Sequence, residues 1–127
     1  MFSSASVDIT TDGSQNATVY LSHGLSRKLN GFLVALKYTP GTIATGAVLT
    51  ITGETSGIPI MIKTGAGTST VFYYPRALLN QVADGAAGAS GTESIPIKDE
   101  RIKVVVTSGG VTKAGSIEAT LLVNSPY

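Results

Sequence analysis

The chain has 127 residues, a length that predicts one domain able to bury roughly two-thirds of the surface that its unfolded form exposes. Nine basic and eight acidic residues give a formal charge of +1, which argues against nucleic acid or an anionic membrane as a partner. The sequence has no cysteine and no apolar run of the roughly 20 residues that a bilayer span needs, so thiol chemistry and membrane insertion are excluded.

Charged residues make up 13% of the chain, about half of the roughly 25% in an ordinary soluble domain. Much of the surface must therefore be neutral, which favours packing against other proteins. The first ten residues, MFSSASVDIT, have neither a basic region nor a long apolar run, so no signal peptide is predicted. The lack of cysteine agrees with maturation in a reducing cytoplasm.

Short runs rich in Val, Ile, Thr and Tyr recur between clusters of Gly, Ser and Pro, and helical periodicity is almost absent. This pattern predicts an all-β fold, an antiparallel β-sandwich or jelly roll, in a single domain over residues 1–127. Residues 1–5 are expected to form a flexible N-terminal arm. The expected strands are residues 6–10, 17–22, 31–38, 47–53, 58–63, 69–74, 94–98, 101–108 and 116–123.

Two acidic residues near the N-terminus, Asp8 and Asp12, raise the question of a calcium loop, but no spaced series of oxygen ligands and no terminal Glu accompany them. An Asx-type turn is the better interpretation. His23 is the only histidine, and GETSG carries its serine at the fourth position instead of the third that a nucleophile elbow requires. We expect no catalytic residue, no cofactor and no metal ligand, so the chain is not predicted to be an enzyme.

Strict alternation in the strand over residues 31–38 places four side chains on one face: Phe32, Val34, Leu36 and Tyr38. The other face is also mostly apolar, which predicts a strand in the middle of a sheet. In residues 47–63, Leu49 and Ile51 alternate with threonines, and Ile58, Ile60 and Ile62 alternate with Pro59 and Met61. We expect a hairpin with GETSG as its turn, and Pro59 at an edge or at a strand start.

The strand pattern breaks after residue 74. The run RALLNQVA predicts about two turns of helix, followed by a Gly- and Ala-rich mobile loop with Asp84 and Thr92 at its ends. Before the helix lie Tyr73, Tyr74 and Arg76. Because Tyr and Arg are favoured at interfaces, these residues and the loop are candidates for contact with a partner. In the alternative interpretation, Tyr73 packs in the core and Arg76 binds nearby backbone carbonyls.

Five charged side chains surround the junction of two later strands: Lys98, Asp99, Glu100, Arg101 and Lys103. Their alternating signs predict a solvated corner between strands in preference to an acid–base site. The following segment, VVVTSGGVTKAGSIEATLLV, predicts a second hairpin with two glycines in its loop. In its second strand Ile117, Ala119, Leu121 and Val123 are expected to face inward.

Three stretches carry a resemblance to a known group: LNGFLVALKYTPGTIATGAVLTITGETSGIPIMI, YYPRALLN and IPIKDERIKVVVTSGGVTKAGSIEATLLV. Over about residues 28 to 123 the chain resembles the small all-β proteins encoded among the head and neck genes of tailed bacteriophages and prophages. The resemblance implies a virion structural protein, assembled in the host cytoplasm, with a role in capsid decoration or as cement. Its partners would be the major capsid protein or other virion subunits, and a homodimer or trimer would suit capsid symmetry. The resemblance brings no active-site residues.

Two other roles compete with capsid decoration. A head–tail neck or tail subunit has the same sequence properties. A carbohydrate-binding β-sandwich module would need a planar row of exposed aromatic side chains, and the chain contains no tryptophan.

Overall fold

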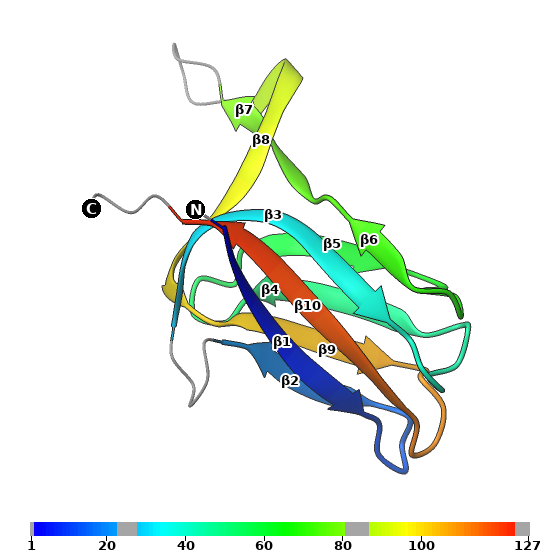
Figure 1. The fold of residues 1–127 in the computed structure, drawn as a ribbon. Helices are drawn as coiled ribbons and strands as arrows, with labels where there is room; N and C mark the ends of the chain where they lie inside the picture. Colours follow the sequence, from blue (N-terminus) through cyan, green and yellow to red (C-terminus); the bar gives the residue numbers. More distant parts are fainter. Residues whose placement is uncertain (1, 23–27, 81–86, 124–127) are drawn as a thin grey trace.

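The computed structural model describes residues 2–22, 28–80 and 87–123, with the backbone alone for residues 77–80 and 87–93. These parts of the chain form ten strands and no helix (Figure 1). The strands are β1 (Phe2–Thr10), β2 (Ala17–Leu21), β3 (Leu29–Thr39), β4 (Val48–Gly53), β5 (Pro59–Lys63), β6 (Val71–Tyr73), β7 (Arg76–Asn80), β8 (Ala87–Glu100), β9 (Ile102–Thr107) and β10 (Ala114–Leu122).

The strands form two antiparallel sheets that face each other (Figure 1). Sheet A has the order β1-β10-β3-β8-β7, with β6 also paired to β3, and sheet B has the order β2-β9-β4-β5. The pairs are nested along the chain, because β1 pairs with β10, β2 with β9, β3 with β8 and β4 with β5. Successive nested pairs lie in alternate sheets, so both sheets contain strands from both halves of the sequence.

A single apolar cluster fills the space between the sheets. Sheet A contributes Leu33, Leu36 and Ile117, and sheet B contributes Leu49 and Ile51, all with 1% exposure or less. Burial of this apolar surface is the main force that holds the two layers together. The inward positions predicted for β10 are confirmed, except that the last of them, Val123, is half-buried after the end of the strand.

Strand β3 lies between β10 and the pair β8 and β6, which confirms the prediction of a central strand. The faces predicted by strict alternation are wrong at one end, because Phe32 is 42% exposed whereas Leu33 is buried. The reason is a β-bulge: Thr120 lies opposite Ala35 and Leu121 opposite Leu33, so Val34 has no opposite residue. One extra residue in a strand reverses the direction of every side chain beyond it.

A second bulge explains the faces of β5. This strand forms an edge of sheet B and begins at Pro59, as predicted. Ile51 lies opposite Met61 and Thr52 opposite Pro59, which leaves Ile60 as the extra residue. The isoleucines that were expected to share one face are therefore separated, since Ile60 is buried but Ile62 is 68% exposed.

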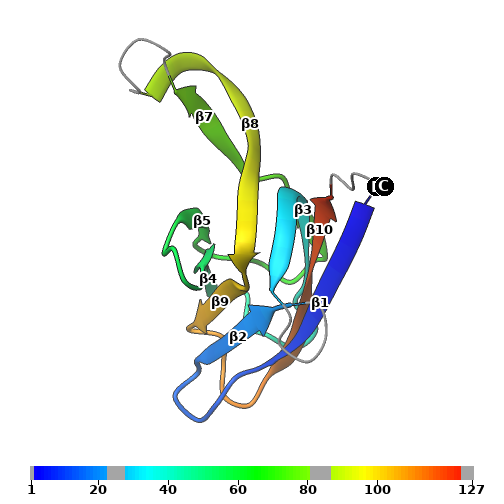
Figure 2. The same cartoon turned by 90° about the vertical axis from the view of Figure 1, so that its left-hand side faces the viewer.

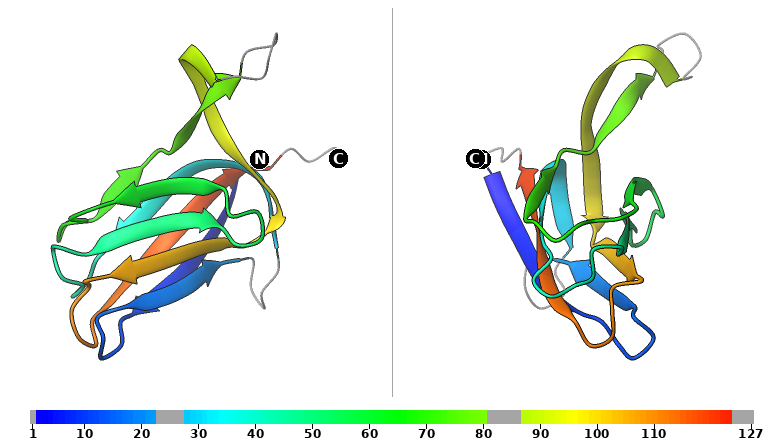
Figure 3. Two further views of the ribbon diagram at one scale, coloured as in Figure 1. Left: turned by 180° about the vertical axis from the view of Figure 1, so that it is seen from behind. Right: turned by 90° about the vertical axis from the view of Figure 1, so that its right-hand side faces the viewer.

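The expected helix at RALLNQVA is not present in its described part. Its first five residues form β7, which pairs antiparallel with β8. Helix propensity is a weak preference, and pairing with a neighbouring strand satisfies the same backbone groups. The expected loop is also shorter than predicted, because β8 begins at Ala87, while Asp84 lies outside the described residues. Together β7 and the first half of β8 form an arm that projects beyond the two sheets (Figures 2 and 3).

Two further expectations are corrected by the topology. The last two strands do not form a hairpin, because β9 lies in sheet B between β2 and β4, and β10 lies in sheet A between β1 and β3. The loop with Gly109 and Gly110 therefore crosses from one sheet to the other. Residues 2–5 are not a flexible arm, since they belong to β1, with Phe2 opposite Leu122 and Ala5 opposite Ala119.

Candidate interaction surface

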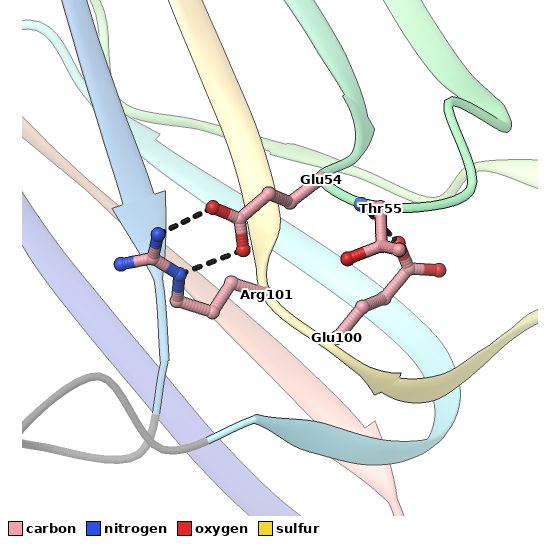
Figure 4. Close-up of polar contacts among 4 residues, drawn as sticks. All are labelled: Glu54, Thr55, Glu100 and Arg101. Carbon is pink, nitrogen blue, oxygen red and sulfur yellow. Dashed lines mark hydrogen bonds and ion pairs between the residues drawn. The ribbon is translucent and has the colours of Figure 1, made fainter.

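The charged residues at the corner between β8 and β9 have a structural role. Glu100 is only 5% exposed, so the expected solvated corner is wrong for this side chain. Its Oε1 accepts a hydrogen bond from the backbone N–H group of Thr55 at 2.9 Å (Figure 4). Ser56 donates two more, from its backbone N–H group to Oε1 at 3.0 Å and from its hydroxyl to Oε2 at 2.8 Å. A Cβ atom at Gly53 would lie 2.7 Å from Oε1, so a larger residue there would displace the carboxylate. Glu100 thus fixes the GETSG turn from the neighbouring sheet.

The adjacent ion pair is also structural. The guanidinium of Arg101 binds both carboxylate oxygens of Glu54 (Figure 4). It also lies 4.2 Å from the ring centre of Tyr20. The hydrogen bond from Arg101 lowers the pKa of Glu54, and the same bond raises the pKa of Arg101. All three groups are thereby occupied with one another, and they connect β2, the GETSG turn and the start of β9.

The sequence raised Asp8, Asp12 and His23 as candidates for metal binding or catalysis. Those that the structure describes lie in a turn or on the surface. Oδ1 of Asp12 accepts hydrogen bonds from the backbone N–H groups of Ser14 and Asn16, which confirms the Asx-type turn. Asp8 lies separately on β1, and His23 lies outside the described residues. Among the described residues, no three His, Asp or Glu side chains lie close enough to hold a metal ion. The described chain also contains no helix long and apolar enough to cross a membrane.

The candidate interface residues lie where the arm leaves sheet A. Tyr73 is half-buried against the core, whereas Tyr74 is 61% exposed. The Nη1 atom of Arg76 donates to the carbonyl oxygens of Val34 and Pro75, at 3.1 and 2.9 Å. Arg76 therefore binds the bulge residue of β3 and holds the base of the arm against the sheet.

Of the two remaining candidates, the structure describes only the backbone of Thr92. The backbone of Thr92 is in β8, opposite Leu78 of β7. Asp84 belongs to the segment between these strands that is outside the described residues.

The outer face of sheet A carries an apolar row that the sequence did not predict. The row consists of Phe2, Leu122, Phe32 and Pro96, which lie opposite one another on β1, β10, β3 and β8. All four are exposed, with values of 67% for Phe2 and 42% for Phe32. Only the bulge in β3 brings Phe32 to this face, because strict alternation would place it with Leu36 and Tyr38. The row ends at the base of the arm, because β8 pairs with β3 only between Ile95 and Glu100, and the arm lies before Ile95.

The other end of the same face is polar. A shallow depression of about 240 Å³ lies there, lined by Ser6, Asp8, Lys37, Thr39, Ser116 and Glu118. The ammonium of Lys37 lies 5.8 Å from the ring centre of Phe72 on β6. The outer face of sheet A is thus divided into a polar end and an apolar end next to the arm.

The chain matches no known family model, and no curated protein is similar enough to count as a relative. The exposed apolar row and the arm are therefore the features from which a function can be inferred.

Proposed function

We propose that this chain is a bacteriophage virion structural protein, a capsid decoration or cement protein that stabilises the head by bridging capsomers. The observation that carries the proposal is the apolar row on sheet A, which continues to the base of a projecting arm. Contiguous exposed apolar side chains on a soluble domain are a mark of a protein-binding surface. The resemblance of residues 28 to 123 to phage head and neck proteins supports the same role.

The strand order supports a jelly-roll sandwich as the fold. Nested pairs that alternate between two facing sheets are what results when one long hairpin is wrapped into two layers, with two Greek keys. In this interpretation β6 and β7 are an insertion between the fifth and sixth strands of the eight-stranded roll. Jelly rolls are common in viral capsid and lectin domains, so the fold alone suits a virion protein but does not identify one.

The arm supports a role in bridging. Residues 87–94 of β8 extend past the last residue paired with β3, a length of about 25 Å for an extended strand. In this part β8 pairs with β7 alone among the described strands. A two-stranded ribbon is marginally stable by itself in water, so a surface that covers the ribbon would stabilise it. An arm of this length would reach a neighbouring subunit while the sheets remain on the first.

The mechanism is a mechanical one. A clamp that contacts two capsomers buries part of each surface, and internal DNA pressure must break these additional contacts before the shell opens. We assign this contact to Tyr74 and Arg76, at the arm base, and to residues 84–92, whereas Tyr73 packs against the core. Tyr and Arg are the residues most often found at the energetic centre of such interfaces.

The test is to mix the purified protein with empty shells that lack it. Cosedimentation and the temperature of shell disruption are then measured for wild type, for the double variant Phe32→Ser and Leu122→Ser, and for Ile62→Ser. Ile62 is a matched control, because it is equally apolar and 68% exposed but lies on sheet B. We expect the double variant to bind at least about tenfold more weakly, since loss of a buried aromatic anchor costs about 2 kcal/mol or more, and the control to bind like wild type.

Two results would contradict the proposal. If wild type neither binds shells nor raises their disruption temperature, capsid decoration is wrong. Binding to purified neck or tail assemblies in the same assay would assign the protein to that part of the virion instead.

A further inference from the structure

The free edges of the two sheets differ in how well they are protected against pairing with another strand. In sheet B, β5 begins with a proline and contains a bulge, and β2 is only five residues long. Proline, bulges and short length are the usual devices that prevent edge pairing. Both edges of sheet B are therefore poor sites for an additional strand.

The β1 edge of sheet A has none of these devices. Strand β1 is nine residues long, and it pairs with β10 from end to end without a shift in register. Its sequence, FSSASVDIT, contains no proline, no basic residue and a single charge, at Asp8. Figure 2 shows β1 at the rim of its sheet, with β10 on one side and no other described strand of that sheet beyond it. A long, regularly paired edge of this kind is a template for another strand.

We propose that a second copy of this chain pairs antiparallel along β1, with a two-fold axis at Ser6, so that sheet A continues across a dimer. A two-fold axis places the same strand on both sides, which is the self-complementary arrangement that most homodimers use. An axis at Ser6, the middle residue of β1, allows the longest overlap of the two strands.

This register also separates the charges. Ser4 lies opposite Asp8 of the second copy, and Ala5 lies opposite Val7 of the second copy. An axis at Asp8 would instead place two carboxylates opposite each other, which is unfavourable. Val7 is half-buried at the margin of the core, and the second copy would cover it further. The polar depression beside Ser6 would adjoin its counterpart across the axis.

The absence of cysteine allows a direct test of the register by crosslinking. Opposite residues in an antiparallel pair have Cα atoms about 4.5 to 5.5 Å apart, within the range that a disulfide spans. Ser6→Cys should therefore form a disulfide-linked dimer under mild oxidation. Ser4→Cys is the matched control on the same exposed face, and its two copies would lie about 13 Å apart. Equal crosslinking of both variants would overturn the proposed register.

A pair of lysine variants tests the interface without oxidation. Ser6→Lys places two positive charges opposite each other at the axis and should raise the dimer dissociation constant about fivefold or more. Ser4→Lys adds the same charge opposite Asp8 of the second copy, so its dissociation constant should equal or fall below that of wild type. Both side chains are exposed, and thermal unfolding of each variant should match wild type.

Sedimentation equilibrium without shells gives the dissociation constants. A strictly monomeric wild type at several hundred micromolar, or equal weakening by both lysines, would overturn the dimer. Because no shell is present, this outcome is distinct from a failure of the proposed capsid attachment.

Discussion

Glu100 is a carboxylate that the protein removes from water without an ion pair to any residue that the structure describes. Burial acts to raise the pKa of Glu100, but hydrogen bonds from Ser56 and Thr55 outweigh it, and the net pKa is lowered. The folded state therefore prefers the ionised form more strongly than the unfolded chain does. The negative charge is a structural element of the GETSG turn.

The first prediction is that Glu100→Gln destabilises the protein at neutral pH by about 1.5 kcal/mol, because hydrogen bonds to a charged acceptor become neutral ones. A group with a lowered folded pKa contributes stability above its unfolded pKa of about 4.3, and this contribution is lost as the pH falls through the folded pKa. The difference in the free energy of unfolding between the variant and wild type should therefore become smaller in acid. Urea unfolding from pH 7 to pH 3 measures it.

Glu118→Gln on the outer face of sheet A is the control for this experiment, because no hydrogen bond connects Glu118 to the turn. A difference between Glu100→Gln and wild type that stays constant down to pH 3 would show that the charge itself is not stabilising.

The buried hydroxyl of Tyr38, unlike the buried carboxylate of Glu100, is not stabilised by hydrogen bonds from the described residues. Its side chain is fully buried, and its hydroxyl has no hydrogen-bond partner among the described residues. Burial, together with the nearby Tyr73, raises the pKa of Tyr38 to about 12. A buried hydroxyl without a partner lowers stability, because it loses its bonds to water and gains none in return.

The second prediction is that Tyr38→Phe stabilises the protein by about 1 kcal/mol at pH 7. At alkaline pH the unfolded tyrosine ionises near pH 10, whereas the folded one stays neutral until about pH 12. Wild type should therefore lose stability as the pH rises from 10 to 12, and the variant should lose less. Thermal unfolding at pH 7, 10 and 11 measures both effects. A variant less stable than wild type at pH 7 would mean that the hydroxyl has a partner after all.

At the scale of elements, the sequence predicted what depends on composition and local period. The all-β class, the central position of β3, the β4–β5 hairpin and the edge position of Pro59 all follow from residues close together in the chain. The other features of the fold depend on pairing between strands that are far apart in the chain. The helical period of RALLNQVA is local, and its first residues form a strand because β8 lies beside them.

The bulges explain why the candidate site was only partly predictable. Tyr74 and Arg76 were proposed from residue type, but the apolar row depends on register across four strands. Its third member faces outward only because Val34 is an extra residue in β3. Nothing in the sequence near Val34 indicates a bulge there, since bulges are set by the pairing of neighbouring strands.

The third prediction concerns the arm. Arg76 lies opposite Ser94, so a two-residue Asn-Gly turn in place of residues 77–93 would close the hairpin at its base. The shortened protein should fold with an unfolding temperature within a few degrees of wild type, because the described core residues lie between the two sheets. Its binding to shells should be lost in cosedimentation. Full binding by the shortened protein would remove the arm from the proposed contact.

At the scale of the whole molecule, the net charge of +1 and the low charge content leave little electrostatic attraction to any partner. Affinity must come from apolar contact and from multiple simultaneous contacts. The proposed dimer provides multiple simultaneous contacts, because its two copies present two arms and two apolar rows. Linked sites increase overall affinity by about 10²- to 10⁴-fold when both can engage at once.

The last prediction combines the two proposals. Ser6→Lys leaves the arm and the apolar row unchanged but weakens the dimer, so at nanomolar concentration it should dissociate from shells at least about tenfold faster than wild type. The oxidised Ser6→Cys dimer cannot separate, and it should be retained longer than wild type under the same dilution. Surface plasmon resonance on immobilised shells measures both dissociation rates, and reduction of the engineered disulfide should return the Ser6→Cys variant to the wild-type rate. If all three proteins dissociate at one rate, each copy binds the shell independently, and the dimer has no part in attachment.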